Sequence, residues 1–339
     1  MQQIKNDLKT LCTAEGVGGQ TAITDAVIAL LKPLVDEVEV DVMGNVLGIL
    51  HADHKDAPTL MLEAHLDEIG FLVTHIDDNG FVYTAAAGGI DKRAITAQPV
   101  VVFGDKPYYG VFCSTPPHLS GKDGELPEVG KCGIDIGLSG EEAKKRVPVG
   151  SRVSYAPNFT ELNENVVSSK ALDDRAGMAA ILHCLRKIGE GKHGVNIAVA
   201  FCVQEELGCR GVTPAVRRLQ PTSAIVTDVS FALTPDADPR KCGKLGKGVM
   251  IGISPILSGY DNLVELAKEK EIPYQYEVMG GGTGTDADRV TVSLMGVPTM
   301  LLSIPQRYMH SPVEVVDVRD VAATGDLMAA FIGQFDERR

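Results

Sequence analysis

Apolar residues near the N-terminus recur first with helical and then with strand periodicity. The positions at helical spacing are Ile4, Leu8 and Leu11, followed by a second set of Ile23, Val27, Leu30, Leu31 and Leu34. Residues 38–50 then place β-prone, partly alternating positions on either side of Gly44 and Asn45. This pattern predicts two helices followed by a β-hairpin.

Four short runs of nearly continuous apolar residues predict strands that are buried on both faces of a sheet. The first starts at Pro58 and leads into His65, and the others span residues 196–203, 223–228 and 298–304. Helical patterns at residues 171–188, 261–270 and 318–335 separate or follow these strands. The alternation predicts an α/β fold with a mainly parallel sheet and helices on both faces.

Residues 71–161 follow a different pattern. Short β-prone runs at residues 81–84, 99–103, 108–113 and 151–155 are separated by glycine and proline. One short helix is predicted to open at Ser139, because Glu142 lies three residues further on, at the spacing of a capping box. A structureless loop of this length is uncommon inside a compact domain. We therefore predict a small β-rich domain (71–161) inserted into a discontinuous α/β domain (1–70 and 162–339).

Composition narrows the class of protein. The 339 residues carry a formal charge of −13 and a pI near 5.1, which argues against nucleic-acid or anionic-membrane partners. No apolar run reaches the ~18 residues of a membrane span, and the N-terminus lacks a signal-peptide core. The seven cysteines contain no CxxC pair. They predict reduced thiols rather than a disulfide framework, and we expect a cytoplasmic protein.

Polar side chains with metal-binding chemistry stand at the ends of the predicted elements. His65, Glu205, Glu206 and Asp228 lie at or just past the ends of buried strands, His310 follows the fourth strand, and Asp173 and Asp174 open a helix. In open α/β sheets this edge binds ligands. Imidazoles and carboxylates together suit zinc, cobalt or manganese, and the surplus of ligands indicates two ions that share a bridging carboxylate.

Each of these residues also has a simpler interpretation. Glu205 and Glu206 can be solvated glutamates at a strand end, and adjacent strand positions would direct them to opposite sides. Asp173 and Asp174 can cap the helix that follows them. Asp67 shares a face with His65, so it can accept the second imidazole N–H and orient the ring. We interpret Cys202 and Cys209 as small packing residues.

Five stretches of the chain resemble the M42 family of co-catalytic metallo-aminopeptidases. They are residues 64–70 (AHLDEIG), 170–177 (KALDDRAG), 203–208 (VQEELG), 227–228 (TD) and 310–312 (HSP). The resemblance implies that His65 and Asp228 bind one metal, that Glu206 and His310 bind the other, and that Asp173 bridges them. It also implies Glu205 as general base, Asp67 as the residue that orients His65, and a cis bond between Asp173 and Asp174.

The same resemblance implies an activity and an assembly. The expected enzyme removes N-terminal residues from peptides with a free N-terminus and uses two divalent ions, Zn²⁺ first, with Co²⁺ or Mn²⁺ as alternatives. The inserted domain is expected to form homodimers, which join into a homododecamer. The preferred N-terminal residue stays open at this stage.

Other functions compete with the aminopeptidase prediction. The same metal centre would serve an N-acyl-amino-acid deacylase or a carboxypeptidase. An endoglucanase would rely on two carboxylates and leave His65 and His310 without a role, and a non-enzymatic metal-binding scaffold is the last alternative. The glycine-rich residues 280–284 lack the Gly-Lys-Ser/Thr ending of a phosphate-binding loop. We interpret them as backbone close to the site, with Asp286 capping the next helix.

Overall fold

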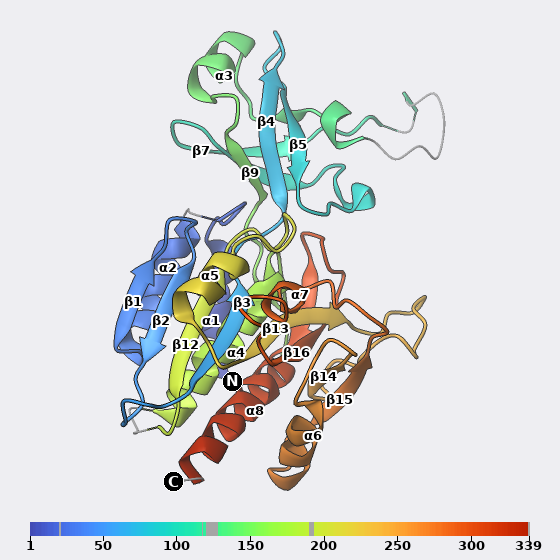
Figure 1. Cartoon of the computed structure of the whole chain (residues 1–339). Helices are drawn as coiled ribbons and strands as arrows, with labels where there is room; N and C mark the ends of the chain where they lie inside the picture. The colour runs from blue at the N-terminus through green and yellow to red at the C-terminus, as the bar shows by residue number, and fades with distance from the viewer. Residues whose placement is uncertain (20–21, 117, 120–127, 190–192, 338–339) are drawn as a thin grey trace.

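The computed structural model describes residues 1–19, 22–116, 118–119, 128–189 and 193–337, which form a large mixed sheet with helices and a small barrel (Figure 1). The strands of the sheet are β1 (Glu37–Val40), β2 (Val46–Leu50), β3 (Thr59–His65), β10 (Thr160–Glu161), β11 (Val166–Ser169), β12 (Asn196–Cys202), β13 (Ser223–Phe231), β14 (Val249–Ile253), β15 (Tyr274–Val278), β16 (Thr299–Arg307) and β17 (Glu314–Asp317). Their order is β1-β2-β12-β3-β13-β16-β17-β11-β10, and β14 pairs with both β15 and β16.

The centre of the sheet is parallel and its flanks are largely antiparallel. Strands β12, β3, β13 and β16 run parallel to one another. The pairs β1-β2, β2-β12, β16-β17, β11-β17 and β14-β16 are antiparallel. The four predicted buried strands are therefore the parallel centre, and the sheet as a whole is mixed. Strands β14 and β15 were not predicted. Strand β14 is a short apolar run that the sequence analysis overlooked, whereas β15 mixes partly buried and exposed side chains and lacks such a run.

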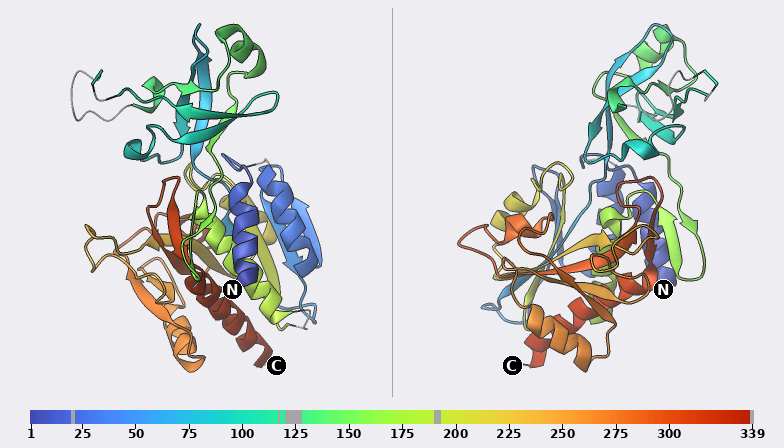
Figure 2. Two further views of the ribbon diagram at one scale, coloured as in Figure 1. Left: turned by 180° about the vertical axis from the view of Figure 1, so that it is seen from behind. Right: turned by 90° about the vertical axis from the view of Figure 1, so that its right-hand side faces the viewer.

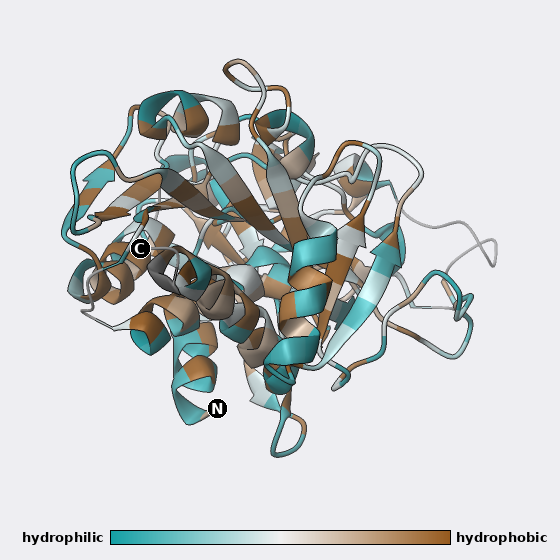
Figure 3. Ribbon diagram, turned by 60° about the horizontal axis from the view of Figure 1, so that its bottom comes forward, coloured by the Kyte–Doolittle hydropathy of each residue, from teal (hydrophilic) through white to brown (hydrophobic). Residues whose placement is uncertain are grey.

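Helices cover both faces of the sheet. One face carries α1 (Gln2–Thr13), α2 (Ala22–Leu31), α4 (Leu172–Ile188), α6 (Tyr260–Glu269) and α8 (Val318–Glu337), and the other carries α5 (Val212–Leu219) and α7 (Ala287–Val290). Apolar positions follow the central strands and the helix sides turned toward them (Figure 3). Among the described residues, no helix combines the length and apolar character that crossing a membrane requires.

Alternation along the central strands decides which side chains reach the α5/α7 face. In β3, Leu60, Leu62 and Ala64 pack with the five-helix layer, whereas Met61 packs with α5 and α7. Because successive strand residues point to opposite faces, His65 shares the side of Met61. The first metal-ligand candidate is therefore directed away from the main core.

The remaining strands close a six-stranded barrel between β3 and β10. They are β4 (Gly70–Ile76), β5 (Val82–Ala87), β6 (Pro99–Phe103), β7 (Pro107–Phe112), β8 (Ile134–Asp135) and β9 (Arg152–Tyr155). The same segment contains α3 (Gly140–Arg146) and 3₁₀ turns at Lys92–Ala94 and Val129–Lys131, and a further 3₁₀ turn at Lys32–Leu34 follows α2. The predicted cap of α3 is present, because the Ser139 side chain accepts the Glu142 N–H. Phe71 packs edge-on against Phe112 and Tyr155 inside the barrel. The barrel stands beyond one end of the sheet in both views of Figure 2.

A buried ion cluster joins three distant segments beside the barrel entrance. Glu68, between β3 and β4, accepts a hydrogen bond from Lys170 Nζ at 2.6 Å and lies 3.3 Å from Arg175 Nη2. It also accepts the Gly16 N–H at 2.8 Å. All three charged side chains are almost completely buried, and Arg175 further donates to the carbonyl of Ala14. The cluster fixes the N-terminal loop and the start of α4 to the end of β3.

Replacing Glu68 with Gln is expected to destabilise the protein by about 3–5 kcal/mol, because Lys170 and Arg175 stay buried without their carboxylate. The matched control is Glu39→Gln, which removes the exposed ion pair with Arg218 and is expected to cost about 1 kcal/mol or less. Urea unfolding of both variants measures the difference. Equal losses of unfolding free energy would contradict a structural role for the cluster.

Candidate metal centre

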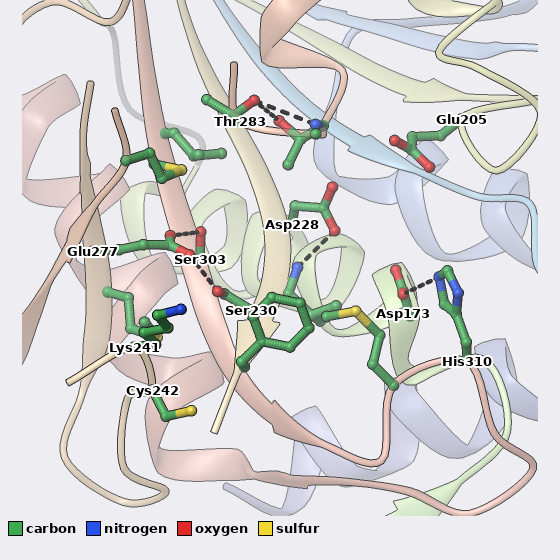
Figure 4. Close-up of a pocket in the computed structure, with 18 of the residues that line it drawn as sticks. Asp173, Glu205, Asp228, Ser230, Lys241, Cys242, Glu277, Thr283, Ser303 and His310 are labelled. Carbon is green, nitrogen blue, oxygen red and sulfur yellow. Dashed lines mark hydrogen bonds and ion pairs between the residues drawn. The ribbon is translucent and has the colours of Figure 1, made fainter. Parts of the chain in front are cut away.

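The structure brings the predicted ligands together at the carboxyl ends of the central strands. His65 ends β3, Asp173 lies at the start of α4, and Glu206 lies in the turn after β12. Asp228 belongs to β13, and His310 lies in the loop between β16 and β17. A cavity of about 1000 Å³ is lined by Asp173, Glu205, Glu206, Asp228 and His310 (Figure 4).

Asp173 occupies the middle of this group. Its Oδ1 lies 2.9 Å from His65 Nε2, and its Oδ2 lies 3.5 Å from His310 Nε2. The peptide bond between Asp173 and Asp174 is cis, as the family resemblance implies. The two oxygens of one carboxylate thus face two different imidazoles, which is the arrangement expected of a bridging ligand.

Each imidazole has one further carboxylate beside it. Glu206 Oε2 lies 3.4 Å from His310 Nε2, and Asp228 Oδ1 lies 4.0 Å from His65 Nε2. Donor atoms of His65, Asp173 and Glu206 lie within 4.8 Å of one another. Two imidazoles and three carboxylates in this arrangement fit two divalent ions of the zinc, cobalt or manganese type.

The electrostatics of the cluster favour a positively charged occupant. Burial raises the pKa of Glu206 to about 7, and the neighbouring Asp173 adds to the rise. Burial also raises the pKa of Asp228 well above its usual range, with further repulsion from Asp173 and Asp174. The hydrogen bond with Glu206 raises the pKa of His310 to about 9. These carboxylates resist joint ionisation, and a bound cation would relieve their repulsion.

Glu205 occupies a separate position in the same cavity. Its Oε1 accepts a hydrogen bond from Cys209 Sγ at 3.2 Å, and its N–H donates to Asp67 Oδ1 at 3.1 Å. Burial raises the pKa of its carboxyl group. Asp67 Oδ1 lies 3.6 Å from His65 Nδ1, slightly beyond a direct hydrogen bond. The Asp67 carboxylate thus binds the backbone N–H of Glu205 and lies beside the His65 ring.

Three details of the sequence interpretation were wrong. Glu205 and Glu206 lie in a turn after Cys202 and Gln204 has a φ of +62°, so strand alternation does not separate them. Asp228 lies inside β13 and not at its end, because pairing with β16 extends the strand to Phe231. Cys209 contacts Glu205, so it is more than a packing residue.

The prediction for Asp286 was also wrong. Its side chain does not cap α7, and it is buried opposite Glu63, with donor atoms of Glu63, Cys202 and Asp286 within 4.8 Å of one another. Burial raises the pKa of Asp286 to about 7 and that of Glu63 well above its usual range. In the glycine-rich loop, Thr283 and Gly284 line the cavity, and Asp288 accepts their N–H groups.

Glu314 is a site residue that sequence analysis missed. Its carboxylate accepts the Asp173 N–H at 3.1 Å and the His310 N–H at 3.0 Å. The side chain is almost fully buried. Glu314 therefore fixes the backbones of two candidate ligands that lie far apart in the sequence. The one available signal was an acidic residue that begins a short apolar strand.

The barrel reaches the site through the loop after β5. A methyl group added at Gly89 would lie 2.7 Å from His310 Nδ1, and one at Gly88 would lie 3.4 Å from the Glu206 side chain. A contact of 2.7 Å is shorter than carbon and nitrogen tolerate, so the imidazole would have to move. The ring position of His310 thus depends on a glycine in the barrel.

Gly89→Ala is expected to displace the His310 ring, so that Nε2 moves away from Glu206 and Asp173. Gly130→Ala is the matched control in the same barrel, because its added methyl would approach nothing closer than 3.7 Å. Crystal structures of the two variants measure the distance from His310 Nε2 to Glu206 Oε2, which is 3.4 Å here. An unchanged distance in Gly89→Ala would show that the loop does not constrain the ring.

Comparison with known proteins finds relatives that are similar to this chain in sequence and in fold. The family model described as M42 glutamyl aminopeptidase matches residues 44–327. Lysyl aminopeptidase of Pyrococcus furiosus is 36% identical over 335 residues, which cover 96% of this chain and 95% of the relative. Aminopeptidase APDkam598 from Desulfurococcus kamchatkensis is 34% identical, with a TM-score of 0.91 and coverage of 98% and 95%. The TET1 peptidase of Pyrococcus horikoshii, described as assembling into a tetrahedron or a large octahedral shell, is 30% identical, with a TM-score of 0.84 and coverage of 97% and 99%.

Proposed function

The chain belongs to the M42 peptidase family, and from this premise we propose that it is a metal-dependent aminopeptidase that removes N-terminal residues from peptides. The observation that carries the proposal is Asp173, which faces one imidazole with each carboxylate oxygen while Glu205 lines the same cavity. This arrangement provides a bridging ligand and a separate base, which are the two parts that metal-assisted amide hydrolysis requires.

The ligands divide into two groups around Asp173. His65 and Asp228 would hold one ion, and Glu206 and His310 the other. Zn²⁺ is proposed first, with Co²⁺ or Mn²⁺ as alternatives. When bound, such dications lower the pKa of water and polarise a carbonyl group. Asp67 and Glu314 support the site from outside, through the contacts with Glu205, Asp173 and His310 described above.

Glu205 would move the proton. Its carboxylate would accept a proton from the attacking water and return it to the leaving amine. A pKa raised by burial suits a group that must both take up and release a proton near neutral pH. The hydrogen bond from Cys209 and the backbone contact with Asp67 hold the carboxylate in the cavity.

The family also supports an assembly. We propose that the barrel (residues 70–155) mediates homodimers, which join into a homododecamer. The side chains of Tyr109 and Val111 lie on the outer face of β7, where they are 74% and 46% exposed. Exposed apolar side chains of this kind are typical of interfaces.

The activity is tested with aminoacyl-p-nitroanilides and their N-acetylated counterparts. We expect hydrolysis of the free-amine substrates alone, loss of activity after chelation, and recovery with Zn²⁺ or Co²⁺. Turnover that survives chelation would contradict the metal-dependent mechanism. Preferential hydrolysis of N-acylated amino acids would instead indicate a deacylase.

Glu205→Gln is expected to lower kcat by about 10²–10⁴-fold, because the amide keeps the shape of the side chain and cannot accept the proton. Elemental analysis should still find two metal ions per subunit, since Glu205 is not a proposed ligand. Glu141→Gln, on the exposed side of α3, is the control and should retain full activity. Full turnover by Glu205→Gln with metal bound would assign the base to another residue.

A further inference from the structure

A second acidic group lines the cavity away from the proposed metal ligands. Glu277, on β15, accepts a hydrogen bond from Ser303 Oγ at 2.6 Å on one oxygen and a hydrogen bond from Ser230 Oγ on the other. Figure 4 shows this group on one side of the cavity, Glu205, Asp173 and His310 on the other, and Asp228 between them. The two serines orient the carboxylate from neighbouring strands.

The position of this group relative to the metal centre follows from strand geometry. Asp228 and Ser230 are alternate residues of β13, so they face the same side and lie about 7 Å apart along the strand. Ser303 is paired with Asp228 in the β13–β16 register. The two serines that hold Glu277 therefore lie within about one strand repeat of Asp228, in the same cavity as the proposed metal ligands.

Glu277 has hydrogen-bond donors but no paired cation among the described residues. No ion pair to Glu277 occurs within the part of the chain that the structure describes. Burial raises the pKa of Glu277, and the two serine hydroxyls oppose that rise. Arg240, at the cavity lining, is already paired with Asp238 at 2.8 Å. Lys241 also lines the cavity and is exposed to solvent.

Part of the lining of this cavity is apolar. Met250, Met279 and Leu301 line the same cavity. Apolar walls that end in a carboxylate match a long side chain with an apolar stem and a cationic head. Lysine and arginine have this form, whereas leucine lacks a cationic head and glutamate would be repelled by the carboxylate.

We propose that Glu277, held by Ser230 and Ser303, selects peptides whose N-terminal residue is lysine or arginine. This assignment rests on the proposed aminopeptidase function and names the residue that recognises the substrate side chain. The carboxylate binds the ammonium or guanidinium group by a charge-assisted hydrogen bond. Glu277 would take no part in cleaving the peptide bond, which the proposed metal centre and Glu205 would carry out.

The test compares kcat/KM for aminomethylcoumarin derivatives of lysine and of norleucine, which has the same chain without the ammonium group. We expect the wild-type enzyme to prefer lysine by about 10- to 100-fold, the range of a hydrogen bond to a charged group. In Glu277→Gln the ratio should fall close to one through loss of lysine turnover, with norleucine turnover changed by no more than about threefold. Thermal unfolding verifies that the variant is folded.

Ser303→Ala provides a second variant that leaves the carboxylate in place. It should lower the lysine-to-norleucine ratio in part, because Glu277 loses one of its two orienting donors. Lys241→Met should leave the ratio unchanged or raise it. A wild-type preference for glutamate that Lys241→Met abolishes would overturn the proposal and assign recognition to the lysine.

Norleucine turnover distinguishes failure of the proposed aminopeptidase function from failure of the role proposed for Glu277. If no free-amine substrate is hydrolysed, the aminopeptidase function itself fails. If norleucine is hydrolysed and Glu277→Gln keeps the wild-type ratio, the function stands and the role of Glu277 is refuted.

Discussion

Repulsion among buried carboxylates is the constraint on which this structure depends. Asp173, Glu206 and Asp228 approach one another near the carboxyl edge of the parallel strands, in a region where burial already penalises the charges of Glu206 and Asp228. The fold holds them there through contacts made elsewhere: Glu314 binds the backbones of Asp173 and His310, and the Glu68 cluster fixes the start of α4. A site that is so unfavourable for anions alone is well suited to cations.

Much of the site was predictable because the central strands carry simple patterns. Strands β3, β12, β13 and β16 are continuous apolar runs, and their parallel arrangement brings His65 and Asp228 to one edge without further information. The inserted β-rich segment was evident from its short runs between glycine and proline. The division of roles between Glu205 and Glu206 came from the family resemblance, because the turn in which both residues lie has no periodicity.

The missed residues act through contacts between distant parts of the chain. Glu314 becomes important only when β17 returns beside the start of α4, and Glu277 only when β15 is added to the sheet beyond β14. Glu63 is hidden within an apolar strand, and its partner Asp286 resembles a helix cap in the sequence. Local patterns cannot reveal such pairs, since their meaning depends on which elements pack together.

The glycine loop between the barrel and the metal centre has a consequence for how the family can diverge. Residue 89 belongs to the barrel by sequence, yet its permitted size is determined by the His310 ring. The outer surfaces of the barrel can therefore vary only while positions 88 and 89 stay free of side chains. A barrel grafted from another protein with a side chain at position 89 would displace the His310 ring, although the barrel itself provides no proposed metal ligand.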